Sequence, residues 1–432
     1  MSRTALINAR LVDPASGLDE QGALLIEDGK IADFGAALFK DAVPEGIEVI
    51  DCGGHVLTPG LIDMHVFTGE PGNEHRETLG SATQAAAAGG VTTIIVMPNT
   101  EPAIDDVALV DFIKRRARDT GLVHVHPMAA LTKGLKGEQM AEMGLLKEAG
   151  AVAFTDADHT LENAQVMRRA MSYSTYLDAL IVNHAAEPSL ARGGVMNEGE
   201  LASRLGLAGI PKAAETIIIE RDIRLVEMTG ARYHVSQVST ADSVDVIRRA
   251  KARGLPVTCG ASACHLTLNE NDVGNYLTFC KLDPPLRSED DRRAVVAGVA
   301  DGTVDVIVSA HDPQDPETKR LPFALSAFGA VGLETLLPAT LSLVHNGDIE
   351  LAAALRALTC HPADLLGLET GRLGTGMPAD LTLIDMGVPW VLDRYKLKSK
   401  SKNSPYDERR LQGRAIRTIV NGKSVYVQGE DV

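Results

Sequence analysis

Several polar side chains come directly after short apolar runs, at the places where strands are expected to end. His65 and His184 close two of these runs, and Asp156 closes a third. Imidazole and carboxylate groups are ligands that zinc takes in proteins. If the fold brings these strand ends together, the three side chains could hold a metal for hydrolytic chemistry. Single histidines and aspartates at strand ends also serve as hydrogen-bonded scaffold residues, and that interpretation stays open at this point.

The elements that must position these side chains alternate between strand and helix through the middle of the chain. This alternation predicts a (β/α)8 TIM-type barrel, in which reacting groups lie at the carboxyl ends of the strands. A doubly wound sheet is the alternative, but no phosphate-binding glycine motif follows the first strand. The expected strands are 61–66, 92–97, 122–127, 151–155, 180–184, 232–238, 256–260 and 304–309, and the expected helices are 81–88, 107–119, 137–149, 162–176, 213–229, 241–253 and 288–300.

Both ends of the chain have the pattern of short strands joined by tight turns. Asn421-Gly422 is a hairpin signal between two apolar runs near the end of the chain. We therefore expect a small, discontinuous β-sandwich domain from residues 1–56 and 376–432, beside a barrel of residues 57–375. The basic run from Lys396 to Lys402 is expected to be a solvated surface loop.

Composition excludes several classes of protein. The 432 residues are 45% hydrophobic and 23% charged, as in ordinary globular proteins. Lys and Arg number 42 against 58 Asp and Glu, and the net charge of −16 disfavours nucleic acid and anionic membranes as partners. Five cysteines without a CxxC pair favour a reduced, cytoplasmic location. The first residues have a strand pattern instead of a signal peptide, and no apolar run approaches the roughly 20 residues of a membrane span.

A set of motifs resembles one enzyme family. Residues 59–72, PGLIDMHVFTGEPG, are similar to the class I dihydroorotase signature PGLIDxHVHLREPG. In the same order follow AAAAGGVTT, MPNT, AVAFTD, YHVSQVST, PPLR and GAVGLET, over nearly the whole chain. The chain thus resembles the class I dihydroorotases of the cyclic amidohydrolase superfamily. The resemblance implies a barrel with a β-sandwich domain, one or two zinc ions, and reversible cyclisation of carbamoyl-aspartate to dihydroorotate in pyrimidine biosynthesis.

Only part of the family's site is present. By resemblance, His65, Asp156 and His184 match metal ligands, and Asn99 matches the residue that binds substrate. These three ligands could supply one weak zinc site with fewer ligands than the family uses, so the resemblance leaves open whether the chain binds zinc.

The other site positions hold residues that cannot do the family's chemistry. Phe67 and Gln237 stand where the resemblance expects two further histidine ligands. Ala310 stands at the position of the aspartate that serves as ligand and general base. Gly69 and Gln314 replace an arginine and a histidine that hold substrate. A missing general base alone costs roughly 10²–10⁴-fold in rate.

Asp312 is a possible substitute base, since it lies two residues beyond Ala310, where strand alternation could turn it inward. The losses favour a non-catalytic homologue of the kind that supports aspartate carbamoyltransferase, which is the partner we expect. The alternative is an active zinc-dependent dihydroorotase with a reduced metal site, acting on a small pyrimidine precursor. A hydantoinase-like or allantoinase-like enzyme is less favoured because it needs the same ligands. A homo-oligomer is expected in each case.

Overall fold

Eight parallel strands form a ring in the middle of the chain, in a computed structural model that describes residues 3–40 and 42–430. The third strand, β8, continues into β9, where the Met128 N–H donates to the Val96 carbonyl at 2.9 Å. The strands of the ring are β6 (Leu61–Val66), β7 (Val91–Val96), β8 (His124–Pro127) with β9 (Ala129–Ala130), β10 (Phe154–Thr155), β11 (Ile181–Asn183), β14 (Tyr233–Val235), β15 (Val257–Ser262) and β16 (Val306–Val308).

Backbone hydrogen bonds join the last strand of the ring to the first. The Phe67 N–H donates to the His311 carbonyl at 2.8 Å, and the His311 N–H donates to the His65 carbonyl at 3.2 Å. All eight strands run parallel, so their carboxyl ends meet at one mouth. The predicted (β/α)8 barrel is confirmed.

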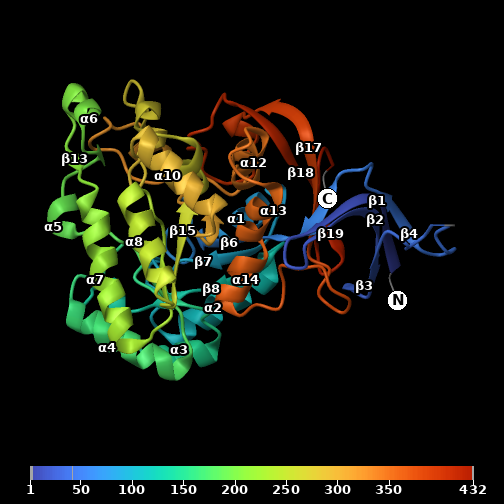
Figure 1. The fold of residues 1–432 in the computed structure, drawn as a ribbon, viewed down its shortest axis with the longest axis horizontal. Coiled ribbons are helices and arrows are strands. Elements are labelled where there is room, and N and C mark those ends of the chain that lie inside the picture. The colour runs from blue at the N-terminus through green and yellow to red at the C-terminus, as the bar shows by residue number, and fades with distance from the viewer. Residues whose placement is uncertain (1–2, 41, 431–432) are drawn as a thin grey trace.

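Amphipathic helices cover the outside of the ring (Figure 1). Helix α7 buries Ile218, Ile219 and Val226 and exposes Ile217, the spacing expected of a helix with one face on a core. Thr240 caps α8 by accepting from the Ser243 N–H at 3.1 Å. The main helices are α1 (Leu79–Ala88), α2 (Val107–Thr120), α3 (Met143–Ala149), α4 (Ala164–Leu177), α7 (Ala213–Thr229), α8 (Ala241–Ala252), α10 (Glu289–Ala300), α12 (Leu336–His345), α13 (Leu351–Leu358) and α14 (Cys360–Leu366).

The helices of the structure differ from the expected ones in two respects. Helix α3 begins at Met143 and not at residue 137, because Thr132 and Met140 form a bridge that holds the intervening segment as a turn. Helices α12, α13 and α14 were not predicted, since they follow the last barrel strand, where no alternation with a further strand marks them.

An eight-stranded sheet built from both chain ends lies beside the barrel (Figure 1). Its strand order is β19-β18-β17-β5-β1-β2-β3, with β4 paired to β1. Asn421 and Gly422 have φ values of 48° and 75°, which suits the predicted tight hairpin. The exact division of the chain at 56/57 and 375/376 stays a prediction. The strands are β1 (Arg3–Asp13), β2 (Leu18–Glu27), β3 (Lys30–Gly35), β4 (Glu48–Asp51), β5 (Val56–Pro59), β17 (Leu381–Val391), β18 (Arg410–Val420) and β19 (Lys423–Val427).

An imidazole–carboxylate pair ties the barrel to this sheet. His124 Nε2 on β8 lies 3.0 Å from Asp380 Oδ2, just before β17. This contact with the Asp380 carboxylate raises the pKa of His124. A raised pKa means that the protonated imidazole stabilises the folded state. This stabilisation is fully present below the pKa of the unfolded chain, about 6.5, and is lost as pH rises through the pKa of the folded state.

We therefore expect His124→Ala to cost at most about 1 kcal/mol, with a larger loss at pH 5.5 than at pH 8.5. Urea unfolding of both proteins at the two pH values measures this difference. His126→Ala is the matched control, because burial lowers the pKa of His126 to about 4 and its pH trend should be opposite. An equal loss for His124→Ala at both pH values would contradict the pairing.

No helix within residues 3–40 and 42–430 is long and apolar enough to cross a membrane.

Candidate functional site at the barrel mouth

A cavity of about 390 Å³ opens at the carboxyl ends of the strands. A second hollow of about 750 Å³ adjoins it and shares Asp158, His159 and Asp283 with it. The barrel therefore brings most of the predicted site residues to one mouth. The cavity is lined by residues that include His65, Phe67, Arg76, Asn99, Gln237, Ala310, Asp312 and Gln314, and the hollow by Asp156 and His184.

His65 ends the first barrel strand as predicted, but its ring is engaged by a neighbouring strand end. Its Nδ1 atom lies 3.1 Å from the hydroxyl oxygen of Ser236, beside Gln237. Burial lowers the pKa of His65 to about 4, so the ring is neutral near pH 7. Gln237 is buried and its Oε1 atom has no hydrogen-bond partner among the described residues. Gln237 therefore offers His65 no imidazole at the position expected to hold a histidine ligand, and His234 earlier on this strand has its Nδ1 atom 2.9 Å from the Thr258 hydroxyl oxygen.

Asp156 turns toward the neighbouring loop instead of toward His65. The Thr132 N–H donates to one carboxylate oxygen at 2.8 Å, and the Thr132 hydroxyl donates to the other. The side chain is buried, so both oxygens are satisfied inside the protein.

His184 pairs with an acidic residue at the rim of the cavity. Its Nε2 atom lies 3.6 Å from Asp283 Oδ1. Burial is the largest single effect and works against the charged ring, but Asp283, Asp158 and Glu215 together outweigh it and raise the pKa of His184 to about 9. His184 Nε2 is therefore engaged by Asp283.

The residues present do not fit a zinc ion. Within the described ranges, no three His, Cys, Asp or Glu side chains are placed where they could share one metal ion. His65, Asp156 and His184 each have a different partner, as described above. A catalytic zinc needs three converging protein ligands. The three predicted ligands lie at one barrel mouth but do not form a metal centre.

An arginine that the sequence analysis missed links the substituted positions. The Arg76 guanidinium lies over the Phe67 ring, with its central carbon 4.3 Å from the ring centroid. It also donates to Asp312 and, through Nε, to the Pro313 carbonyl at 2.8 Å. Gln314 donates to the second Asp312 oxygen at 3.0 Å. A cation stacked on an aromatic face and bonded to a carboxylate therefore fills this side of the mouth.

The segment after the eighth strand explains the placement of Asp312. Ala310 has a φ of 50°, in the left-handed region, which turns the chain before His311. Asp312 lines the cavity as predicted, and burial raises its pKa to about 6 although Arg76 opposes the shift. Its role as a substitute base stays a prediction, because both oxygens are held by Arg76 and Gln314.

Asn99, which is predicted to bind substrate, also lines the cavity. Its amide nitrogen donates to Asp158 Oδ2 at 2.8 Å, and its Oδ1 atom is buried with no hydrogen-bond partner in the part of the chain that the structure describes.

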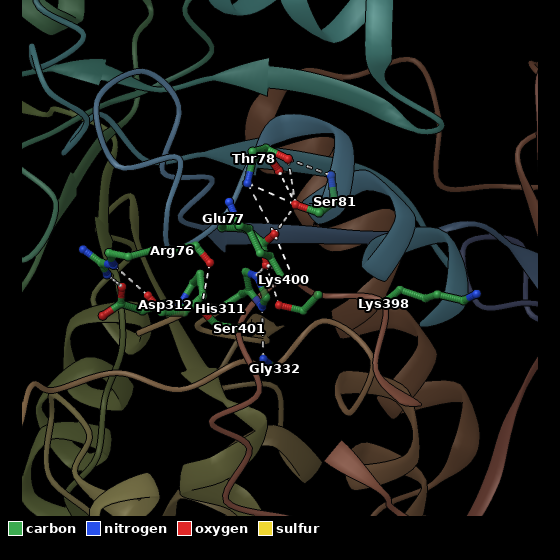
Figure 2. A network of polar contacts seen from close by, with 12 residues as sticks. Arg76, Glu77, Thr78, Ser81, His311, Asp312, Gly332, Lys398, Lys400 and Ser401 are labelled. Atoms are coloured by element: carbon green, nitrogen blue, oxygen red, sulfur yellow. Dashed lines mark hydrogen bonds and ion pairs between the residues drawn. The ribbon is translucent and has the colours of Figure 1, made fainter. Parts of the chain in front are cut away.

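A buried glutamate holds the strand-one loop, the strand-eight loop and the basic run together (Figure 2). Glu77 Oε2 lies 3.4 Å from His311 Nε2, and both side chains are fully buried. Glu77 also accepts from the hydroxyls of Ser81 and Ser399 and from the Lys400 N–H at 3.2 Å. Burial alone would raise the pKa of Glu77, but the contacts with His311, Ser399 and Ser81 together outweigh burial and lower it.

The expectation that Lys396 to Lys402 form a solvated loop is therefore wrong in part. Ser399 and Ser401 point inward and are buried, while Lys398 and Lys400 are exposed between them. Ser401 donates to the Arg76 carbonyl at 2.7 Å. The serine–lysine alternation in the sequence was the signal for a segment with one buried face.

Known proteins resemble the chain in sequence and fold. A family model described as dihydro-orotase-like matches residues 54–243. A dihydroorotase of Ehrlichia canis is 45% identical over 424 residues, 98% of this chain and 94% of the relative. The chain belongs to the dihydroorotase family. A dihydroorotase of Pelobacter propionicus is likewise 45% identical, over 97% of this chain and 98% of the relative.

Solved structures of related amidohydrolases share the fold of this dihydroorotase-family chain. The L-hydantoinase (dihydropyrimidinase) of Arthrobacter aurescens superposes with a TM-score of 0.90 at 26% identity, over 100% of this chain and 98% of that one. The dihydropyrimidinase of Brevibacillus agri gives 0.85 at 20% identity, over 100% and 96%. The second likeness concerns the fold alone.

Proposed function

We propose that this chain is a non-catalytic member of the dihydroorotase family that supports aspartate carbamoyltransferase in cytoplasmic pyrimidine biosynthesis. The observation that carries the proposal is the mouth of the barrel. Phe67 and Ala310 offer no metal donor there, Gln237 offers an amide in place of an imidazole, and the retained donors are bonded to other partners. The fold is kept while the reacting groups are lost, as in homologues that act by binding a partner enzyme.

The partner is tested by mixing the purified chain with aspartate carbamoyltransferase from the same organism. Size-exclusion chromatography with light scattering is expected to show a complex of fixed stoichiometry, and carbamoyltransferase activity should persist to lower protein concentration in its presence. Phe67→His is the matched control, because it alters the cavity and should leave the complex unchanged. Elution of the two proteins separately would refute the partner role and leave the loss of catalysis untouched.

An active dihydroorotase with a reduced zinc site is the second candidate, favoured by relatives at 45% identity that carry this name. Zinc would supply a Lewis acid and an activated water. His65, Asp156 and His184 would have to hold it, so Asp156 would have to leave Thr132 and His184 would have to leave Asp283. A hydantoinase-like activity would require the same changes.

A further inference from the structure

Two buried lysines fasten the segment that follows the last barrel strand. This segment, residues 316–328, begins with helix α11 (Pro316–Lys319), and we call it the roof segment. Ala327 and Phe328 at its end line the mouth cavity. Lys281 and Lys319 are only 2% and 4% exposed, although lysine is rarely buried without a partner of opposite charge.

Lys281 holds the middle of the roof segment through three backbone carbonyls. Its Nζ atom donates to Phe323 at 2.9 Å, Ala324 at 3.1 Å and Ser326 at 2.7 Å. Three acceptors match the three N–H bonds of an ammonium group. The Phe328 ring, with its centroid 4.6 Å from Nζ, adds a further contact that favours the charge.

Lys319 joins the end of the roof segment to the segment around Thr278, and it does so through only two backbone carbonyls. Its Nζ atom donates to Thr278 at 3.0 Å and to Ala327 at 2.7 Å. A neutral amine has two N–H bonds and can make both contacts. The closed roof segment therefore accommodates Lys319 as a neutral amine. An ammonium in this place would have neither a third acceptor nor a bonded carboxylate among residues 3–40 and 42–430.

The charges around Lys319 do not offset the effect of burial on its pKa. Asp312 favours the charged form, but its oxygens are already bonded by Arg76 and Gln314. Arg76 and Lys281 oppose a further positive charge, and the Cys280 thiol is the other titratable neighbour. Burial is the largest cause and lowers the pKa of Lys319 to about 7. Asp315, Glu317 and Arg320 are the charged residues of α11 and its flanks.

We propose that the roof segment opens with uptake of a proton by Lys319, so that it closes more tightly over the barrel mouth as pH rises. An exposed lysine keeps its proton up to a pKa of about 10.4, so between neutral and alkaline pH the open form binds more protons than the closed form. The free energy of opening therefore increases with pH in this window, by at most a factor of ten in the opening equilibrium per pH unit. Neutral solution therefore favours access to the mouth cavity relative to alkaline solution.

Amide hydrogen exchange of the full chain tests this coupling. Protection of residues 320–328, corrected for the intrinsic exchange rate at each pH, is expected to rise severalfold and at most about tenfold per unit from pH 7 to pH 9. Amides of α10 serve as the internal reference and should show a flat profile. A flat profile for residues 320–328 in the natural chain would overturn the proposal without any variant.

Two substitutions assign the effect to Lys319. Lys319→Met keeps an unbranched apolar side chain and is expected to abolish the pH slope. Lys133→Met removes a lysine whose side chain is 44% exposed and should keep the slope. The same slope in Lys319→Met as in the natural chain would overturn the assignment, and if that variant does not fold, the profile of the natural chain decides.

Discussion

The purified chain, supplied with zinc, is expected to hydrolyse dihydroorotate at least about 10²–10⁴-fold more slowly than a family member with a complete site, because the position of the general base holds Ala310. The missing donors at Phe67 and Gln237 add to this loss, although effects within one constellation need not multiply. Metal content by mass spectrometry, measured together with a dihydroorotate hydrolysis assay, checks the expectation. One bound zinc per chain with steady turnover would contradict it.

The combined variant Phe67→His, Gln237→His and Ala310→Asp returns three metal donors to the mouth. It is expected to bind more zinc than the natural chain. Aspartate accepts the left-handed backbone of position 310 better than most residues, so this substitution suits the local conformation. Zinc uptake is the first measurement, since it does not depend on recovered turnover. Leu145→Met, at a residue that is 56% exposed, is a control that should leave the zinc content unchanged.

Glu77→Ala is expected to lower the free energy of unfolding by about 3–5 kcal/mol, because it leaves a buried histidine and several donors without their shared acceptor. His311 and Glu77 are both fully buried, so bulk solvent does not reach the groups that lose the carboxylate. Urea unfolding at pH 7 measures the change. The lowered pKa of Glu77 means that its contribution exists above the unfolded value of about 4.3 and is lost as pH falls through the folded pKa.

Two controls separate this network from a general effect of removing a carboxylate. Glu77→Gln keeps the shape and an acceptor oxygen, so it should cost less than Glu77→Ala. Glu142→Ala removes a carboxylate that is 69% exposed and paired with Lys133 at 3.5 Å, and little change is expected. Equal losses for Glu77→Ala and Glu142→Ala would contradict the role assigned to the network.

The strands of the barrel were predictable because each is a short, nearly continuous apolar run, and a parallel sheet buries both faces of its strands. Helix α7 was predicted with the bounds that the structure shows, since its buried residues recur at helical spacing. The carboxyl ends of strands in a closed ring must meet, so the gathering of His65 and His184 at one mouth also followed from the sequence.

The partners of the site residues were not predictable from local pattern. Asp156 bonds to Thr132, and Arg76 bonds to Asp312, which is 236 residues away along the chain. Such contacts depend on which rotamer packs best after the ring has closed, and a single arginine in a loop gives no periodic signal. The alternation of serine and lysine in the basic run indicates a serine face, but Glu77, which Ser399 contacts, lies 322 residues away along the chain.

The sheet built from both chain ends cannot be completed until the end of the chain has been synthesised. Strand β5 pairs with β17, and the Ser399 hydroxyl donates to Glu77. Segments made early therefore reach their final contacts only after segments near the end of the chain have been made. A ribosome adds about 5–20 residues per second, so the completed β1–β5 segment must wait on the order of tens of seconds for β17 to emerge. During that interval one side of β5 is an open edge, and Leu57 and Leu24 lack the apolar cover that Leu381 and Ile419 later provide. The nascent amino-terminal segment therefore carries an unpaired strand edge and uncovered apolar side chains until β17 has been made.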